Sequence, residues 1–235
     1  IEGTIWQTSD LANGNLLATA NRPASKNLEL ISNNSGDDNN DGLTPETAWA
    51  TMDKIRTEAT EGTFIAGNVI ALKKGDSFNV SYLSFTGLNG AVGNPIVFTS
   101  YGEGDKPIIS GMYDQNMDYA EISPNIWKAT TGAVGGTRWT RNGVEMFGMS
   151  TNFELLGTNV PVLMEWFYGD SGDGNSRLHI YSTTDPNPDI IKTNFYAYMV
   201  QFIDCSYITF DNIDVQGGRS TSVRIAGGHD ITIQN

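Results

Sequence analysis

Two segments near the end of the chain, YITFDN at residues 207–212 and DITIQN at residues 230–235, carry one pattern at an interval of 23 residues (230 minus 207). The same interval aligns five pairs of residues: Val200 with Val223, Phe202 with Ile225, Ile208 with Ile231, Phe210 with Ile233, and Asn212 with Asn235. A fixed interval of this length indicates a solenoid, in which each repeat stacks on its neighbour.

One repeat contains three short strands by pattern, at about Ile208–Phe210, Ile213–Val215 and Val223–Ile225. Each strand places two apolar side chains on one face and polar side chains on the other. Three strands per repeat predict an all-β fold, a parallel β-helix, with regular coils over residues 199–235. We expect the two aligned asparagines to bond the same turn of adjacent coils as a ladder. Tandem β-hairpins could give a similar spacing.

The strongest helix signal lies in the stretch ISNNSGDDNNDGLTPETAWATMDKIRTEA at residues 31–59. Thr44 can cap a helix, and Pro45 suits its first position. The apolar residues Trp49, Met52 and Ile55 then follow at three-residue steps, which favours one apolar helix face. The pattern therefore predicts a single helix over Thr44–Ala59 that caps the N-terminal end of the solenoid, within a cap of residues 28–60.

Residues 113–198 interrupt the regular strand pattern and are expected to form an excursion from the coils. Within it, LMEWFYGDSGDGNSRLHIYS at residues 163–182 predicts a β-hairpin, with an aromatic strand, a Gly/Asp loop and an alternating return strand. Trp139, Trp166 and Tyr168 could stack on sugar rings, but packing of the excursion is the favoured role.

The chain is acidic, with 14 Lys and Arg against 27 Asp and Glu, for a formal net charge of −13. This balance argues against general binding of nucleic acid or anionic membranes. It also disfavours acidic polysaccharides unless a basic patch or a bound cation intervenes. The only cysteine, Cys205, excludes an internal disulfide and is expected to be a buried thiol. No apolar run is long enough to span a bilayer.

Several stretches together resemble one known family. They are GDDNNDGLTPETAWATMDKI, GNVIALKKGDSF, GNPIVFTSYGEGDKPIISG, MEWFYGDSGDGNSRLHIYSTTDPNP, CSYITFDNIDVQGG and GGHDITIQN. Over residues 28–112 and 160–235 the chain resembles the N-terminal portion of secreted, right-handed parallel β-helix proteins of the pectate-lyase-like superfamily. The resemblance implies one right-handed β-helix domain over residues 1–235, incomplete at its C-terminal end and located outside the cell or at its surface.

The resemblance implies a polysaccharide as the partner but leaves the reaction open, because this fold carries many functions. A polysaccharide lyase or a glycoside hydrolase is the first expectation. The alternative is a non-catalytic β-helix protein, namely an adhesin, a surface fibre or a glycan-binding protein. An open C-terminal edge with Ile231 and Ile233 further predicts self-association of the 235-residue chain.

The loop DDNNDG places Asp37, Asn39 and Asp41 at alternate positions before a glycine, as in the first half of a calcium-binding loop. The closing glutamate of such a loop is missing, because Ala48 occupies its position. The loop therefore predicts either a calcium site or an Asx-rich turn. The hairpin loop with Asp170, Asp173 and Asn175 is a weaker case of the same pattern.

Outward side chains of the regular coils are the catalytic candidates, namely Asp211, Asp214, Arg219, Arg224 and His229. A hydrolase would need two carboxylates at a defined separation, and Asp211 and Asp214 could supply them. A lyase would need a base and a cation beside a sugar carboxylate, for which Arg224 or His229 could serve, with calcium if it binds. For each residue a solvated or turn-bonded role is the simpler alternative.

Overall fold

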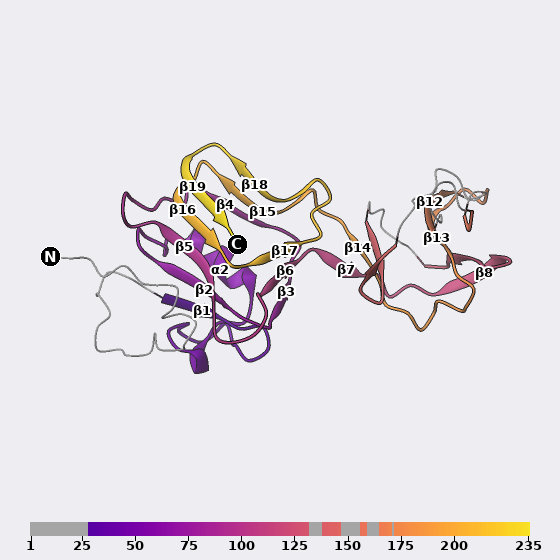
Figure 1. Ribbon diagram of the computed structural model, residues 1–235, viewed down its shortest axis with the longest axis horizontal. Helices are drawn as coiled ribbons and strands as arrows, with labels where there is room; N and C mark the ends of the chain where they lie inside the picture. Colours follow the sequence, from indigo (N-terminus) through magenta and orange to yellow (C-terminus); the bar gives the residue numbers. More distant parts are fainter. Residues whose placement is uncertain (1–27, 132–137, 147–155, 159–164, 171) are drawn as a thin grey trace. The chain divides into compact units, whose positions relative to one another are not determined.

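The computed structural model describes residues 28–131, 138–146, 156–158, 165–170 and 172–235 of the chain (Figure 1). Within these residues the protein is mostly β, with one α-helix. The described residues divide into two compact units, the first within residues 28–110 and 198–235 and the second within residues 111–197. None of the described helices is both long and apolar enough to cross a membrane.

The first unit is built from three parallel sheets. Sheet 1 contains, in spatial order, β1 (Leu28–Ile31), β2 (Val69–Lys73), β5 (Ile96–Tyr101), β16 (Ser206–Asp211) and β19 (His229–Gln234). Sheet 2 contains β3 (Ser77–Asn79), β6 (Ile108–Ser110) and β17 (Asp214–Gln216). Sheet 3 contains β4 (Leu83–Thr86), β15 (Tyr198–Ile203) and β18 (Thr221–Ala226). From β2 onward the strands of this unit follow the order sheet 1, sheet 2, sheet 3, and each such pass is one coil.

The register of the strands confirms the 23-residue interval. In sheet 1, Ile208 lies beside Ile231 and Phe210 beside Ile233, while in sheet 3 Val200 lies beside Val223. Ile208, Phe210 and Val200 are buried in one core, and Val223 and Ile231 pack against it, because residues of equal parity lie on one face of a strand. An aromatic stack fills this core, with ring centroids 4.9–6.2 Å apart among Phe85, Phe98, Phe202 and Phe210.

The backbone repeats with the same interval at the turns. Three aligned pairs take left-handed φ values between 50° and 82°, namely Asp204 with Gly227, Tyr207 with Asp230, and Asn212 with Asn235. Asparagine and aspartate accept this conformation more readily than most residues. The turn asparagines also bond the preceding coil, since Asn212 Nδ2 donates to Ser100 Oγ at 2.6 Å and Asn235 Nδ2 donates to Asp211 Oδ1 at 2.7 Å. Each amide thus bonds a different acceptor, whereas the sequence suggested an asparagine ladder.

The single helix predicted over Thr44–Ala59 is wrong in its first half. Residues Pro45–Thr47 form a 3-10 helix capped by Thr44, and the α-helix α2 spans Met52–Thr60. The two are separate because Trp49 pairs with Ile31 at the edge of β1 and takes extended backbone. Asp38 fixes the new start of α2 by accepting hydrogen bonds from Ala50 N, Thr51 N and Thr51 Oγ1 at 2.6–2.9 Å. The face with Met52 and Ile55 is buried in the core, as expected.

In its described residues the second unit contains two antiparallel sheets of four strands each. Sheet 4 has the order β11 (Val144–Glu145), β10 (Trp139–Arg141), β14 (Ile191–Asn194) and β7 (Met112–Asp114). Sheet 5 has the order β12 (Trp166–Asp170), β13 (Ser176–Tyr181), β9 (Ile126–Ala129) and β8 (Tyr119–Ser123). The first and last strands of this unit along the chain, β7 and β14, pair with each other, and Met112 lies beside Asn194.

The predicted hairpin is present as β12 and β13, paired from Trp166–Ile180 to Asp170–Ser176. It is one part of a larger unit, since β13 also pairs with β9. Trp139 and Trp166 are buried in the core of this unit, with ring centroids 6.1 Å apart, and Tyr168 packs against that core. These three aromatic residues therefore pack the unit, which was the favoured expectation.

Candidate functional site

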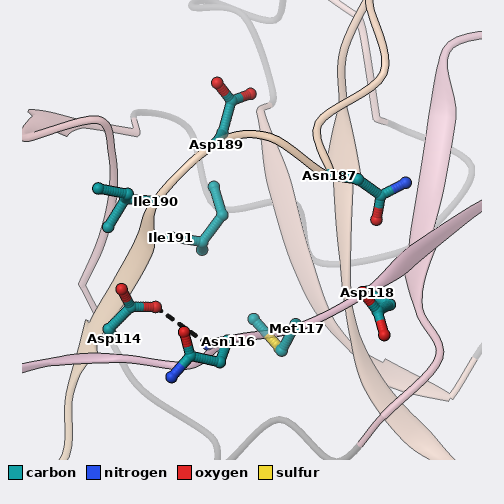
Figure 2. Close-up of a pocket in the computed structure, with 8 residues that line it drawn as sticks. All are labelled: Asp114, Asn116, Met117, Asp118, Asn187, Asp189, Ile190 and Ile191. Carbon is teal, nitrogen blue, oxygen red and sulfur yellow. Dashed lines mark hydrogen bonds between the residues drawn. The ribbon is translucent and has the colours of Figure 1, made fainter.

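A pocket of about 260 Å³ lies within the second unit and is mostly polar (Figure 2). Its lining residues are Asp114, Asn116, Met117, Asp118, Asn187, Asp189, Ile190 and Ile191. Met117 and Ile191 are buried, whereas Asp114, Asn116, Asp118 and Asn187 are exposed. The pocket therefore combines buried apolar side chains with an accessible rim of carboxylates and amides.

Two loops that are distant in sequence form the pocket: residues 115–118 between β7 and β8, and residues 182–190 between β13 and β14. Asn187 joins them, because its Oδ1 accepts from Tyr119 N at 2.6 Å and its Nδ2 donates to Tyr119 O at 3.1 Å. Gln115 N also donates to Ile191 O at 3.1 Å. These bonds fix the backbone of both loops, so the rim side chains project from a defined frame.

Asp189 is held by an ion pair at one side of the pocket. Arg141 Nε and Nη2 lie 2.6 Å and 2.5 Å from Asp189 Oδ2, and Asn142 Nδ2 donates to Asp189 Oδ1 at 2.6 Å. Partial burial acts to raise the pKa of Asp189, but the hydrogen bonds from Asn142 and Arg141 and the guanidinium charge lower it overall. Asp189 is therefore an ionised structural carboxylate whose oxygens are already engaged.

Asp114 and Asp118 differ from Asp189 because they have no ion pair among the described residues. Asp114 Oδ1 accepts from Asn116 N at 3.0 Å, the interaction drawn as a dashed line in Figure 2. Asp118 uses its backbone oxygen to accept from Thr130 N and Oγ1 at 2.8 and 3.0 Å. Both carboxylates thus keep acceptor capacity toward the pocket.

The hydroxyl of Tyr119 is buried beside these groups and has no hydrogen-bond partner among the described residues. Burial raises the pKa of Tyr119; the charge of Arg141 opposes this rise, and the charges of Asp114 and Asp189 add to it. The hydroxyl therefore lies within the electrostatic reach of two pocket carboxylates. An unsatisfied buried hydroxyl is costly, so a partner outside the described residues would stabilise it.

The residues predicted as catalytic are distributed over the strands and turns of the three parallel sheets. Asp211 ends β16 in sheet 1, Asp214 begins β17 in sheet 2, and Arg224 lies in β18 of sheet 3. His229 pairs with Ser206 and Asp211 with Gln234, so they lie five residues apart along sheet 1, about 16 Å at the usual rise of a strand. Asp211 is also buried, with 4% of its surface exposed.

Arg224, His229 and Asp214 each have a local partner. Arg224 Nη1 donates to Gln201 Oε1 at 3.1 Å, and its guanidinium lies 4.7 Å from the centre of the Tyr198 ring. His229 Nδ1 lies 2.8 Å from Asp230 Oδ2. Asp214 accepts from Gln216 Nε2 at 2.7 Å. Arg219 lies in the turn between β17 and β18.

The proposed calcium loop is organised by Asx turns. Asp37 Oδ1 accepts from Asn39 N and Nδ2 at 2.9 and 2.8 Å, and Asp41 Oδ1 accepts from Leu43 N and Thr47 Oγ1 at 3.0 and 2.6 Å. Among the described residues, no three His, Cys, Asp or Glu side chains are grouped so that they could hold a metal ion. Calcium binding here would need Asp37 and Asp41 to exchange these bonds for the cation.

The hairpin loop follows the same principle. Asp170 Oδ1 accepts from the backbone of Gly172, Asp173 and Gly174 at 2.8–3.0 Å. Asp173 pairs with Lys128 and accepts from Asn175 N, and these bonds lower the pKa of Asp173 to about 2. The carboxylates of Asp170 and Asp173 therefore stabilise the turn of the hairpin.

The pocket residues were missed at the level of sequence, although a signal was available. The segments DQNMD at residues 114–118 and DPNPD at residues 185–189 both have the pattern D-x-N-x-D. In each segment the first aspartate accepts a hydrogen bond from the asparagine backbone, at 3.0 Å for Asn116 and 2.9 Å for Asn187. The two copies are far apart along the chain, and only the fold shows that they meet.

No protein-family model matches the chain, and no curated protein sequence matches it. Among solved structures the chain is similar to XylC, solved in complex with xylose, with a TM-score of 0.57 and 16% identity. A glycoside hydrolase gives a TM-score of 0.48 at 13% identity, covering 80% of this chain and 50% of that one. The GH136 lacto-N-biosidase from Eubacterium ramulus, as a selenomethionine derivative, gives 0.43 at 16% identity, covering 89% and 26%.

The XylC alignment covers 79% of this chain and 34% of XylC, so the chain spans about a third of that protein's length. At this identity the likeness concerns the fold. The chain thus shares its mostly β architecture with XylC.

Proposed function

We propose that the chain is the N-terminal portion of a carbohydrate-active protein built on a right-handed parallel β-helix. The succession of sheets 1, 2 and 3 in each coil supports the β-helix. Right-handedness is expected because parallel crossover connections are right-handed in about 98% of cases. The single observation that carries the functional proposal is the fold likeness to XylC, a protein solved with xylose bound.

For the whole protein we propose a glycoside hydrolase or a polysaccharide lyase as the activity. For the residues described, sugar binding is the better supported role. Asp211 is buried, and Asp214, Arg224 and His229 are engaged with local partners. The same observation favours the second candidate function, a non-catalytic glycan-binding protein, adhesin or surface fibre.

The pocket of the second unit is the proposed place of sugar contact. Sugar hydroxyls can donate to carboxylates and accept from amides, and the rim offers both kinds of group. Its volume of about 260 Å³ is below the range of about 300–1,000 Å³ typical of drug-sized ligands, which suits one sugar ring.

Binding of the chain to immobilised polysaccharides, together with chromatography of any released oligosaccharides, tests this proposal. We expect retention on at least one glycan, with xylan the first to try. Product release would identify a hydrolase or a lyase, and a lyase product would carry the absorbance of an unsaturated sugar. If the folded chain is retained on no glycan and binds no mono- or oligosaccharide, the proposed function is wrong.

We also propose that the protein acts outside the cell or at its surface.

We further propose that calcium binds the loop of Asp37, Asn39 and Asp41. The D-x-N-x-D pattern of this loop supports the calcium site. A ligand that binds only the native state raises the thermal midpoint of unfolding. We therefore expect millimolar calcium to raise the midpoint of the wild type and not that of Asp41→Ala. An equal shift in both proteins, or no shift, would remove the calcium site.

A further inference from the structure

The charge of the pocket restricts the sugars that it can accept. Asp189 is neutralised by Arg141, but Asp114 and Asp118 have no ion pair among the described residues. Lys192 lies opposite Asp114 in the pairing of β7 with β14, but it forms no ion pair within 4.0 Å of a described carboxylate. Asp118 therefore carries its charge at the rim without an ion pair, and Asp114 is compensated only at a distance by Lys192, so a further negative charge brought into the pocket would be repelled.

The neutral groups of the pocket suit an uncharged ring. Met117 and Ile191 provide a buried apolar surface, and Ile190 adds an aliphatic side chain that is 50% exposed. The C–H face of a sugar can lie on such a surface while its hydroxyls donate to Asp114 and Asp118.

We propose that the pocket binds a single sugar residue that carries no carboxylate, and that it discriminates against uronic acids through Asp114 and Asp118. The inference rests on the proposed function and extends it to the class of sugar. It bears on the reaction as well, because a lyase removes a proton beside a sugar carboxylate whereas a hydrolase has no need of one. A pocket with this preference favours a hydrolase or a glycan-binding protein of neutral polysaccharides.

The test is an NMR titration of the 235-residue chain labelled with ¹³C at the methionine methyl groups. Met117 lines the pocket and reports on it, while Met52, buried in the core of the first unit, serves as the internal control. Xylose, glucose and glucuronate are the ligands, because glucose and glucuronate differ only at C6. We expect xylose or glucose to shift the Met117 methyl signal but not that of Met52. We expect glucuronate to bind with an affinity at least about tenfold lower than that of glucose.

Two variants decide whether charge is the cause. Asp118→Asn removes one negative charge from an exposed rim position without a change of shape, and Asp105→Asn removes the same charge at an exposed position of the first unit, outside the pocket. We expect Asp118→Asn to reduce the ratio of the glucuronate to the glucose dissociation constant by at least about threefold. We expect Asp105→Asn to leave this ratio unchanged.

Each other outcome overturns the inference in a distinct way. Equal binding of glucose and glucuronate at Met117 would refute the charge selection and leave the proposed function standing. Sugar binding that leaves Met117 unchanged would place the sugar elsewhere on the chain. A Met117 shift with calcium chloride alone, and with no sugar, would identify the pocket as a cation site. Absence of binding by any sugar would count against both the inference and the proposed function.

Discussion

The ion pair between Asp189 and Arg141 determines how one wall of the pocket responds to pH. The folded pKa of Asp189 is lowered, so its stabilising contribution is complete above the pKa of the unfolded chain and is lost as the pH falls through the folded value. We expect Asp189→Asn to reduce the free energy of unfolding by about 1–2 kcal/mol at neutral pH. Urea unfolding measures this value.

The pH dependence separates this explanation from a simple packing defect. The difference between wild type and Asp189→Asn should shrink as the pH is lowered below about 4, because the unfolded wild-type chain then binds a proton at Asp189 while the folded carboxylate, with its lowered pKa, stays ionised to a lower pH. The matched variant Asp105→Asn, at an exposed position without a described ion pair, should show no such trend. A deficit in Asp189→Asn that is constant across the acid range would contradict the assignment.

Single residues also explain why the pocket could not be predicted. The repeat D-x-N-x-D is visible in the sequence, but such a pattern also occurs at residues 37–41, where its carboxylates complete Asx turns. The meeting of Asn187 with Tyr119 joins positions 68 residues apart. No local pattern encodes a contact over that separation, so the D-x-N-x-D pattern alone cannot distinguish an isolated turn from the rim of a pocket.

At the level of elements, β19 can pair with β16 only because Gly228 has no side chain. A Cβ atom at Gly228 would lie 1.7 Å from Cys205 O, whereas one at Gly93 would meet nothing within 4 Å. Both glycines have left-handed backbone, with φ of 82° and 71°. We expect Gly228→Ala to destabilise the protein by more than about 2 kcal/mol and Gly93→Ala by about 1 kcal/mol, the cost of the left-handed conformation alone.

Chemical unfolding of the two variants gives the comparison. The expected difference isolates the close approach of the two coils from the strain that both substitutions share. Equal losses in Gly228→Ala and Gly93→Ala would show that the contact with Cys205 O is relieved cheaply. Hydrogen exchange in β19 should also accelerate in Gly228→Ala, because its amide bonds depend on the register with β16.

The strands of residues 199–235 were predictable, since the 23-residue period repeats a local pattern and the register of β16 with β19 follows it. The start of α2 was not, because Trp49 gains more from pairing with Ile31 than from continuing a helix. The antiparallel sheets of the second unit lack a period. Their strands β7 and β14 pair across nearly the whole unit, so only the hairpin of β12 and β13 left a local signal.

At the level of the whole molecule, the second unit occupies one connection between sheet 2 and sheet 3. The other two connections, between β3 and β4 and between β17 and β18, are residues 80–82 and 217–220. We therefore expect a variant in which residues 111–197 are replaced by a copy of residues 217–220 to keep the β circular dichroism and cooperative melting of the first unit. Loss of cooperative melting would show that the first unit depends on the second.

The outermost strands of the first unit predict how the isolated chain behaves in solution. Ile225 in β18 and Ile233 in β19 are 49% and 44% exposed, beside strand edges with free backbone groups. Such edges recruit other strands. We expect light scattering to detect association of the 235-residue chain, and we expect Ile233→Lys to reduce it. Ile122→Lys, at an equally exposed position of the second unit, should not. A monodisperse wild-type monomer would refute this expectation.

The pairing of Met112 with Asn194 has a consequence for how the chain folds. Stacking β16 on β5 requires the chain to close a loop that includes residues 111–197, and closure entropy grows with the logarithm of loop length. Once β7 has paired with β14, Met112 and Asn194 are already adjacent, and the effective loop between Ile96 and Ile208 falls from 112 residues (208 minus 96) to about 30. The shortening is worth about 1 kcal/mol of closure entropy. Folding of the second unit therefore makes the stacking of β16 on β5 faster, because the loop that has to close is shorter.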